Sequence, residues 1–216
     1  MILVEHFVSI NGEGRKAGEL ALFLRFKGCN LKCSWCDTAW ANEKDCPGSP
    51  VSTEQLCALA KSEGVKNITL TGGEPLLQEG IGEVICALGK EGFEVEIETN
   101  GSVPLPDGLM PRPSYTMDYK LPGSGMENRM CLENFEKLTL EDTVKFVCAS
   151  SADLEKAREI TDKYKLAEKC KVYLSPVFGS IDPAEMAEYM KKHQMNGVRL
   201  QLQLHKIIWD PNARGV

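Results

Sequence analysis

Short runs of β-branched and aromatic residues alternate with longer amphipathic segments along most of this 216-residue chain. The short runs predict strands at residues 21–26, 67–71, 93–99, 115–119, 143–148, 171–175 and 198–204. The amphipathic segments predict helices at residues 53–63, 76–90, 132–138, 152–169 and 183–193. Strand–helix repetition builds a parallel sheet with helices outside it, which predicts an α/β fold. Because a complete barrel needs about 250 residues, we expect a truncated, partial TIM-like barrel of about six parallel strands with fewer outer helices.

Two predicted helices begin with residues that favour helix starts. Ser52 and Gln55 have the spacing of a capping box, and Asp182 precedes Pro183 as a cap precedes an N1 proline. Between two predicted strands, residues 102–114 are rich in proline and glycine, so we expect a loop there in place of a helix.

Composition and charge narrow the partners of the chain. A net charge of −6 argues against nucleic-acid binding, which needs clustered Lys and Arg. No apolar run approaches the roughly 18 residues of a membrane span, and the N-terminus lacks the basic region of a signal peptide. We therefore expect a cytoplasmic protein, with residues 1–216 forming one domain in which residues 1–18 are an N-terminal strand and loop.

Polar and glycine-rich motifs follow most of the predicted strands. They read GCNLKCSWCDT, TGGEP, ETNG, DYK, SPVFG and QLHK, in chain order. The carboxyl ends of parallel barrel strands meet at one edge, where such folds carry their chemistry. The motifs are therefore expected to form one site.

Three of the nine cysteines, Cys29, Cys33 and Cys36, lie together in the first of these motifs. A zinc site usually shows two cysteine pairs, and an electron-transfer 4Fe–4S cluster normally uses four thiolates. Three thiolates on one loop would leave one iron of a 4Fe–4S cluster open to another ligand. Five other cysteines stand singly in mostly apolar segments and are expected to be free thiols: Cys57, Cys86, Cys131, Cys148 and Cys170.

The CxxxCxxC spacing, with Trp35 before the last cysteine, resembles the radical S-adenosylmethionine (SAM) superfamily, as does TGGEP at residues 71–75. The resemblance implies that SAM chelates the open iron. One electron from the cluster then cleaves SAM to methionine and a 5′-deoxyadenosyl radical. It also implies SAM contacts at thirteen positions, although relatives more often have serine in place of Asp118. They are Trp35, Asp37, Gly72, Gly73, Glu74, Asn100, Asp118, Tyr119, Lys120, Ser175, Pro176, Val177 and Phe178.

NGEG at residues 11–14, followed by Arg25, resembles the 7-carboxy-7-deazaguanine synthase family. The resemblance implies 6-carboxy-5,6,7,8-tetrahydropterin as the substrate. A glutamate such as Glu13 suits the paired N–H donors of its pyrimidinone edge, and Arg25 suits its carboxylate. Asn11 replaces the usual glutamine, so we expect backbone contacts only from Ile10, Asn11 and Gly12. Thr71 is a further substrate residue by the same resemblance.

Thr38 and the C-terminus complete this resemblance. The family implies that the Thr38 hydroxyl ligates Mg²⁺, an ion that prefers oxygen ligands, although a helix-capping role was an equal alternative. The predicted last strand would present Gln201, Gln203 and His205 on one face. His205 is then a substrate or proton-transfer candidate, and residues 205–216 would fold back so that Val216 meets the substrate.

The family resemblance implies a carbon–nitrogen lyase that forms 7-carboxy-7-deazaguanine and releases ammonia on the route to queuosine. The deoxyadenosyl radical would take a hydrogen atom from C6 and return it later. A homodimer and a flavodoxin-like electron donor are also implied. Two alternatives stay open: a glycyl-radical enzyme activase, which is also short and carries CxxxCxxC, and a non-enzymatic iron–sulfur or zinc protein.

Overall fold

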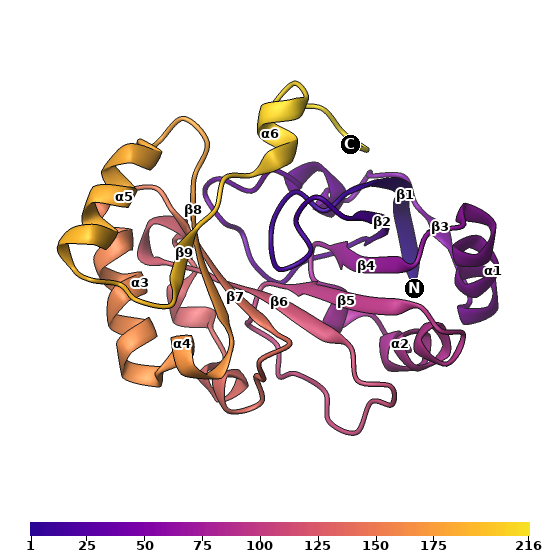
Figure 1. Ribbon diagram of the computed structural model, residues 1–216. Helices are drawn as coiled ribbons and strands as arrows, with labels where there is room; N and C mark the ends of the chain where they lie inside the picture. Colours follow the sequence, from indigo (N-terminus) through magenta and orange to yellow (C-terminus); the bar gives the residue numbers. More distant parts are fainter.

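The computed structural model describes residues 1–216 as a curved nine-stranded sheet with helices on its outer side (Figure 1). The strands are β1 (Ile2–Ile10), β2 (Leu20–Phe26), β3 (Ser49–Pro50), β4 (Asn67–Gly72), β5 (Glu94–Thr99), β6 (Ser114–Tyr119), β7 (Thr143–Cys148), β8 (Lys171–Pro176) and β9 (Val198–Leu200). The helices are α1 (Thr53–Glu63), α2 (Ile81–Lys90), α3 (Ser151–Tyr164), α4 (Leu166–Lys169), α5 (Pro183–Lys192) and α6 (Leu204–Ile208).

The sheet has the order β3-β1-β2-β4-β5-β6-β7-β8-β9 and does not close on itself. From β2 to β9 every neighbouring pair is parallel, whereas β1 runs antiparallel to both β2 and β3. The predicted partial barrel is therefore confirmed, and all seven predicted strands are present. The segment at residues 102–114 indeed contains no helix.

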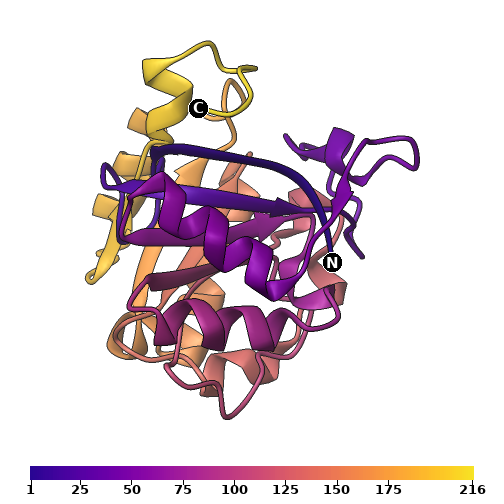
Figure 2. The same ribbon diagram turned by 90° about the vertical axis from the view of Figure 1, so that its right-hand side faces the viewer.

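Side chains alternate between the two faces of the sheet. The outer face is apolar and packs under the helices as one cluster of 33 buried residues, which includes Leu24, Leu70 and Phe146. In Figure 2, α1 and α2 lie side by side against this outer face, and they contact each other. The inner face is mostly polar, because the alternate positions carry residues such as Thr69 and Glu96. Hydrophobic burial thus holds the helices to the sheet and leaves the polar face for the interior.

The predicted caps are present. Ser52 Oγ accepts a hydrogen bond from Gln55 N, and the Gln55 side chain accepts one from Ser52 N at 2.8 Å, which completes the capping box. The Asp182 carboxylate accepts from Ala184 N at 2.8 Å where α5 begins. No helix is both long enough and apolar enough to span a membrane.

Four predicted elements differ from the structure. The helix predicted at 76–90 begins only at Ile81, after a 3₁₀ helix at Pro75–Leu77. The helix predicted at 152–169 breaks at Lys165, whose φ of 51° is left-handed, and the one predicted at 132–138 is a 3₁₀ helix, Leu132–Glu136. The last strand stops at Leu200, opposite Leu174, although its partner β8 continues to Pro176.

The chain beyond β9 makes different contacts. Gln201 N still donates to Leu174 O at 2.9 Å, but Leu204 N donates to Gly12 O, also at 2.9 Å. The final residues of the last predicted strand therefore leave the sheet, and the chain continues as α6. This helix and the C-terminal tail lie near β1, away from β9 (Figures 1 and 2).

Candidate active site

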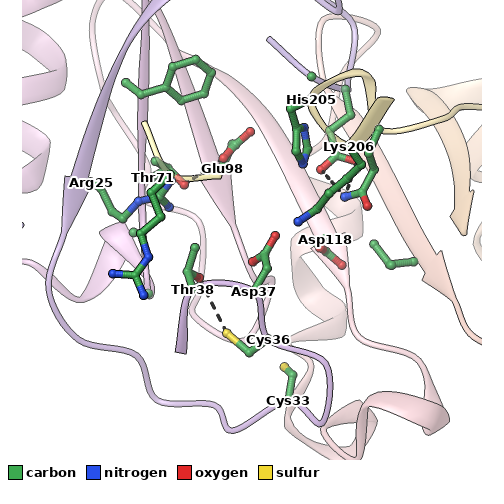
Figure 3. A pocket seen from close by; sticks show the side chains of 18 of the residues that line it. Arg25, Cys33, Cys36, Asp37, Thr38, Thr71, Glu98, Asp118, His205 and Lys206 are labelled. Atoms are coloured by element: carbon green, nitrogen blue, oxygen red, sulfur yellow. Dashed lines mark hydrogen bonds between the residues drawn. The ribbon is translucent and has the colours of Figure 1, made fainter. Parts of the chain in front are cut away.

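One cavity of about 570 Å³ lies at the carboxyl ends of the parallel strands. Each of the six polar motifs contributes at least one lining residue. In Figure 3, Cys33 and Cys36 lie at one end of the cavity, Arg25, Thr71 and Glu98 lie along one wall, and His205 and Lys206 approach from the opposite wall.

The three clustered cysteines line this cavity from the loop that follows β2. Cys29 Sγ accepts weak hydrogen bonds from Leu31 N at 3.4 Å and Asn100 Nδ2 at 3.5 Å. Burial raises the pKa of the Cys29 and Cys33 thiols, and the neighbouring cysteines raise it further. All three thiols thus line the cavity from one short loop.

The thiol arrangement fits an iron–sulfur cluster. No three His, Cys, Asp or Glu side chains converge on a position for one metal ion. A structural zinc site needs four nitrogen or sulfur ligands, whereas three thiolates can hold a 4Fe–4S cluster that has one open iron. All nine cysteines are free thiols, and no fourth cysteine lines the cavity. A 4Fe–4S cluster held here would keep one iron open.

The two glycines of TGGEP hold the cysteine loop against β4. A Cβ on Gly73 would lie 2.2 Å from Gly28 O, and a Cβ on Gly72 would lie 2.3 Å from Phe26 O. Glu74 N also donates to Gly28 O at 2.9 Å. We expected these glycines to admit a ligand. They line the cavity, but the closest contact of Gly72 is with the end of β2 at Phe26, and that of Gly73 is with Gly28 in the cysteine loop.

Eight other predicted SAM and Mg²⁺ residues line the cavity: Trp35, Asp37, Thr38, Asn100, Asp118, Lys120, Val177 and Phe178. Thr38 precedes a 3₁₀ helix, but its side chain does not cap that helix, and its Oγ1 lies 3.6 Å from Cys36 Sγ. Lys120 Nζ lies 3.0 Å from Asp118 Oδ2. Burial alone would lower the pKa of Lys120, but the Asp118 carboxylate outweighs it and raises that pKa.

Five predicted site residues do not line the cavity: Asn11, Glu74, Tyr119, Ser175 and Pro176. The Glu74 carboxylate is fully buried and accepts hydrogen bonds from Asn100 N at 2.7 Å and Thr99 Oγ1 at 2.9 Å. Its oxygens are thus committed to the strand ends and are not available to a ligand. The Tyr119 ring faces the outer core, between Phe135 and Phe146.

Asn11, Ser175 and Pro176 are likewise buried beside the cavity without lining it. The Asn11 side chain lies inside the barrel, where its Oδ1 accepts from Thr69 Oγ1 at 3.2 Å. Its backbone N and O both bond within the N-terminal loop, to Glu19 and Gly18. The backbone groups of Asn11 thus already have partners within the loop, whereas its neighbours Ile10 and Gly12 line the cavity.

Strand register places a row of polar side chains across the upper barrel, by which we mean the end of the barrel that holds the cavity. Glu5 pairs with Arg25 across β1 and β2, and Arg25 pairs with Thr71 across β2 and β4. Arg25 Nε donates to Glu5 Oε1 at 2.7 Å, and Thr71 Oγ1 donates to Glu98 Oε2 at 2.8 Å. All four residues line the cavity. Sequence reasoning missed Glu5 and Glu98, although alternation from Arg25 and the ETNG motif both pointed to this row.

Lys145 is another charged residue of the cavity that was not predicted from the sequence. Its Nζ lies 2.5 Å from Glu13 Oε1 and 3.4 Å from Asp118 Oδ2, and its side chain is about 10% exposed. Burial opposes the charged form of Lys145, but Glu13, Asp118 and Glu98 outweigh it and hold its pKa well above the usual range. Nothing in the local sequence marks Lys145, because it stands within an ordinary predicted strand.

His205 and the C-terminal tail close one side of the cavity. His205 lies at the start of α6 rather than on a strand face, and a Cβ on Gly12 would lie 2.1 Å from its Nδ1. Burial lowers the pKa of His205, which favours the neutral ring. Residues 211–216 also line the cavity, and the Arg214 guanidinium lies 4.2 Å from the centre of the Trp40 ring.

Below the cavity, Glu96 is 5% exposed and accepts a hydrogen bond from Thr116 Oγ1 at 2.5 Å. Burial raises its pKa to about 7. A raised pKa favours folding at low pH, and this stabilisation is lost as pH rises through about 7. The unfolding free energy of the unaltered protein should therefore fall as pH rises from 5 to 8. In Glu96→Gln this fall should be smaller by about 2 to 3 kcal/mol, as measured by urea melts at each pH.

Glu94→Gln is the matched control for Glu96→Gln. Lys66 and Lys16 lower the pKa of Glu94 to about 2, so it stays ionised over this range. Its substitution should leave the shape of the pH profile unchanged. Parallel profiles for the unaltered protein and Glu96→Gln would contradict the prediction for Glu96.

Comparison with known proteins agrees with this architecture. The sequence profile of the Radical SAM superfamily matches residues 24–110. The 7-carboxy-7-deazaguanine synthase of Clostridium acetobutylicum is 52% identical over 99% of this chain and 98% of its own. The synthase of the same name from Chlorobaculum tepidum is 38% identical over 98% of this chain and 96% of its own.

Solved structures show the same fold. The crystal structure of QueE from Escherichia coli superposes with a TM-score of 0.75 at 24% identity, covering 94% of this chain and 93% of that one. Streptococcus suis SuiB bound to the precursor peptide SuiA superposes with a TM-score of 0.60 at 14% identity, covering 83% of this chain and 48% of that one.

Proposed function

Since the chain belongs to the 7-carboxy-7-deazaguanine synthase family of radical SAM enzymes, we propose that it converts 6-carboxy-5,6,7,8-tetrahydropterin into 7-carboxy-7-deazaguanine and releases ammonia. One observation carries the proposal: the three clustered thiols and the charged groups Glu13 and Arg25 line a single cavity. The enzyme is therefore a carbon–nitrogen lyase in queuosine biosynthesis.

Cys29, Cys33 and Cys36 would hold the 4Fe–4S cluster, and SAM would occupy the adjoining part of the cavity. When bound, the cluster and SAM together supply a 5′-deoxyadenosyl radical. Lys120 offers a cation to the SAM carboxylate, with Asp118 holding it in place at 3.0 Å. Trp35, Asn100 and Phe178 line the same region and would enclose the rest of SAM.

The opposite part of the cavity suits the carboxypterin. Glu13 would accept the two N–H donors of the pyrimidinone edge, as a carboxylate does with donor edges of bases. Arg25 uses its Nε for Glu5, so its terminal nitrogens stay available to the substrate carboxylate. Thr71 and Glu98 lie beside Arg25, and Val216 lines the same cavity.

Thr38 and His205 have subsidiary roles in this proposal. The Thr38 hydroxyl, free of any capping bond, would ligate Mg²⁺ next to the substrate carboxylate. His205 lies against Gly12 at the side of the cavity, where its neutral ring can hold or accept a substrate proton.

The two alternative functions do not fit the relatives or the cavity. A glycyl-radical activase would have no use for Glu13 and Arg25 facing a cavity of small-molecule size. A non-enzymatic iron–sulfur or zinc protein would not share 52% identity over its whole length with a synthase. The radical SAM enzyme is the function that accounts for both halves of the cavity.

The enzyme would work in the cytoplasm with a flavodoxin-like electron donor and as a homodimer. Apolar side chains that stay exposed could cover one another in such a dimer: Val8, Leu20, Leu202, Ile207, Ile208 and Trp209.

The decisive experiment incubates the reconstituted, reduced enzyme with SAM and the carboxypterin under anaerobic conditions. Formation of 7-carboxy-7-deazaguanine with SAM regenerated would support the proposal. Deoxyadenosine formation without that product would keep the radical SAM activity and reject the substrate. No SAM cleavage at all would reject the enzymatic function.

Glu13→Gln should raise the KM for the carboxypterin about 10- to 100-fold, because an amide offers one acceptor where the substrate edge presents two donors. Uncoupled SAM cleavage in the absence of the carboxypterin should stay unchanged. Steady-state product assays and deoxyadenosine assays measure the two effects separately. The exposed Glu133 provides the control substitution Glu133→Gln. Loss of the cluster in Glu13→Gln would refute the assigned role.

A further inference from the structure

The open side of the barrel is bridged by side-chain and backbone contacts rather than by strand pairing. The sheet ends at β3 and β9, and β1 does not pair with β9. Residues 12–14, which follow β1, instead meet residues 201–205, which follow β9. We call these two segments together the clasp.

Four contacts join the two halves of the clasp. Gly14 N donates to Gln201 Oε1 at 2.7 Å, and Gln201 Nε2 donates to Gly14 O at 3.0 Å. Leu204 N donates to Gly12 O at 2.9 Å. Gln203 Nε2 makes a longer contact with Glu13 Oε1 at 3.4 Å. The two contacts of Gln201 bind both main-chain groups of one residue, so they restrict the loop more than a single bond would.

Gln201 and Gly14 are each fixed on their own side. Gln201 N donates to Leu174 O at 2.9 Å, which ties the Gln201 backbone to β8. Gly14 has a φ of 80°, and a Cβ there would lie 3.3 Å from Thr116 Oγ1 on β6. The clasp thus connects a rigid sheet edge to a loop packed on the barrel interior.

The residues held by the clasp are those that face the cavity. Glu13 directly precedes Gly14 and directs its carboxylate to Lys145, and His205 lies against Gly12. Gln201 itself does not line the cavity. An effect of Gln201 on the substrate would therefore pass through the clasp residues that line the cavity, among them Glu13 and His205.

We infer that Gln201 is a positioning residue for the substrate: its paired bonds to Gly14 hold Glu13 and His205 where they meet the carboxypterin. This inference rests on the proposed function. It identifies a residue outside the cavity that determines affinity for the substrate and the coupling of SAM cleavage to product formation, while leaving SAM binding alone.

Two substitutions separate hydrogen bonding from packing. Gln201→Met keeps the length of the side chain and removes both bonds. Gln201→Glu keeps an acceptor for Gly14 N but places a carboxylate against Gly14 O. The KM for the carboxypterin should rise about tenfold in Gln201→Met and less in Gln201→Glu, with the KM for SAM unchanged. The ratio of deoxyadenosine to product should rise in the same order.

A matched control and a readout independent of activity complete the test. Gln55→Ala likewise removes a glutamine side-chain bond to a main-chain group, the one that Gln55 Oε1 accepts from Ser52 N in the capping box of α1, and Gln55 does not line the cavity; it should leave the KM for the carboxypterin unchanged. Amide hydrogen exchange of the protein without ligands should speed up at residues 12–18 in Gln201→Met and not in Gln55→Ala.

The outcomes discriminate among the explanations. A lower melting temperature and kcat with an unchanged KM for the carboxypterin would show that Gln201 only closes the barrel, and would overturn the inference. Unchanged exchange at residues 12–18 would also overturn it. If Gln201→Met does not fold, Gln201→Glu carries the same comparison. If the unaltered enzyme cleaves SAM but forms no product from the carboxypterin, the proposed function fails first, and the exchange data still report whether the clasp exists.

Discussion

Cys33→Ala is expected to abolish SAM cleavage, reducing deoxyadenosine formation to the level seen without enzyme. Two thiolates cannot hold a cluster that needs three protein ligands, and no fourth cysteine lines the cavity to replace the lost one. The fold should persist, because Cys33 lies on a partly exposed loop outside the hydrophobic core. We expect the unfolding free energy of the protein without its cluster to change by less than about 1 kcal/mol.

Visible absorption of the reconstituted protein, iron content and an anaerobic deoxyadenosine assay would check the effect of Cys33→Ala. Cys57→Ala is the matched control, since Cys57 lies on α1 and does not line the cavity. It should retain both cluster and activity. If Cys33→Ala kept a full cluster and cleaved SAM at the normal rate, the assignment of the three thiolates would be wrong.

Lys145→Met should produce the largest loss of stability among changes to the upper barrel, about 3 kcal/mol or more of unfolding free energy. Lys145 is the cation between the Glu13 and Asp118 carboxylates, and methionine would leave Glu13 enclosed without a cation and Asp118 with Lys120 alone. Uncompensated buried charge costs several kcal/mol, whereas the apolar chain of methionine fills the same space. The KM for the carboxypterin should also rise at least about tenfold, because Glu13 loses the contact that orients it.

The pH dependence of Lys145→Met tests the cause. Burial raises the pKa of Asp118, but Lys120 and Lys145 outweigh it and hold that pKa below its usual value. Without Lys145 this carboxyl should take up a proton more readily, so the difference in unfolding free energy between Lys145→Met and the unaltered protein should narrow as pH falls below about 4. Lys156→Met removes an exposed ion pair on α3 and should change the unfolding free energy by less than about 1 kcal/mol. Equal effects of the two substitutions would contradict the role given to Lys145.

Much of this molecule could be predicted from local patterns. Strand–helix alternation identified the seven parallel strands, and Ser52 and Asp182 marked true helix starts. The cysteine spacing and TGGEP identified the end of the cavity that suits a cluster and SAM. These features succeed because they depend on near neighbours in the chain: a loop of eight residues carries all three thiols, and two glycines meet the end of β2 and the loop that follows it.

The polar half of the cavity was only partly predictable. Lys145 and Glu5 lie in no motif, and Glu98 begins the ETNG motif without being predicted as a site residue; their importance comes from cross-strand register and from partners up to 132 residues away. Tyr119 and Glu74 stand next to motif residues but face the outer core or the strand ends. Adjacent positions on a strand point to opposite faces, so a motif read as a continuous string overstates the number of ligand contacts.

The sequence by itself determined the chemistry available to the chain: three thiolates on one loop, the glycines that hold this loop, and an open parallel sheet with its motifs at one edge. Only the tertiary structure decided how the remaining charges are used. The last strand stops at Leu200 although β8 continues to Pro176, and the chain then turns to meet Gly12 and Gly14. This long-range contact brings Glu13, Lys145 and His205 to one cavity, since the energy of a buried charge depends on its neighbours in space, not in sequence.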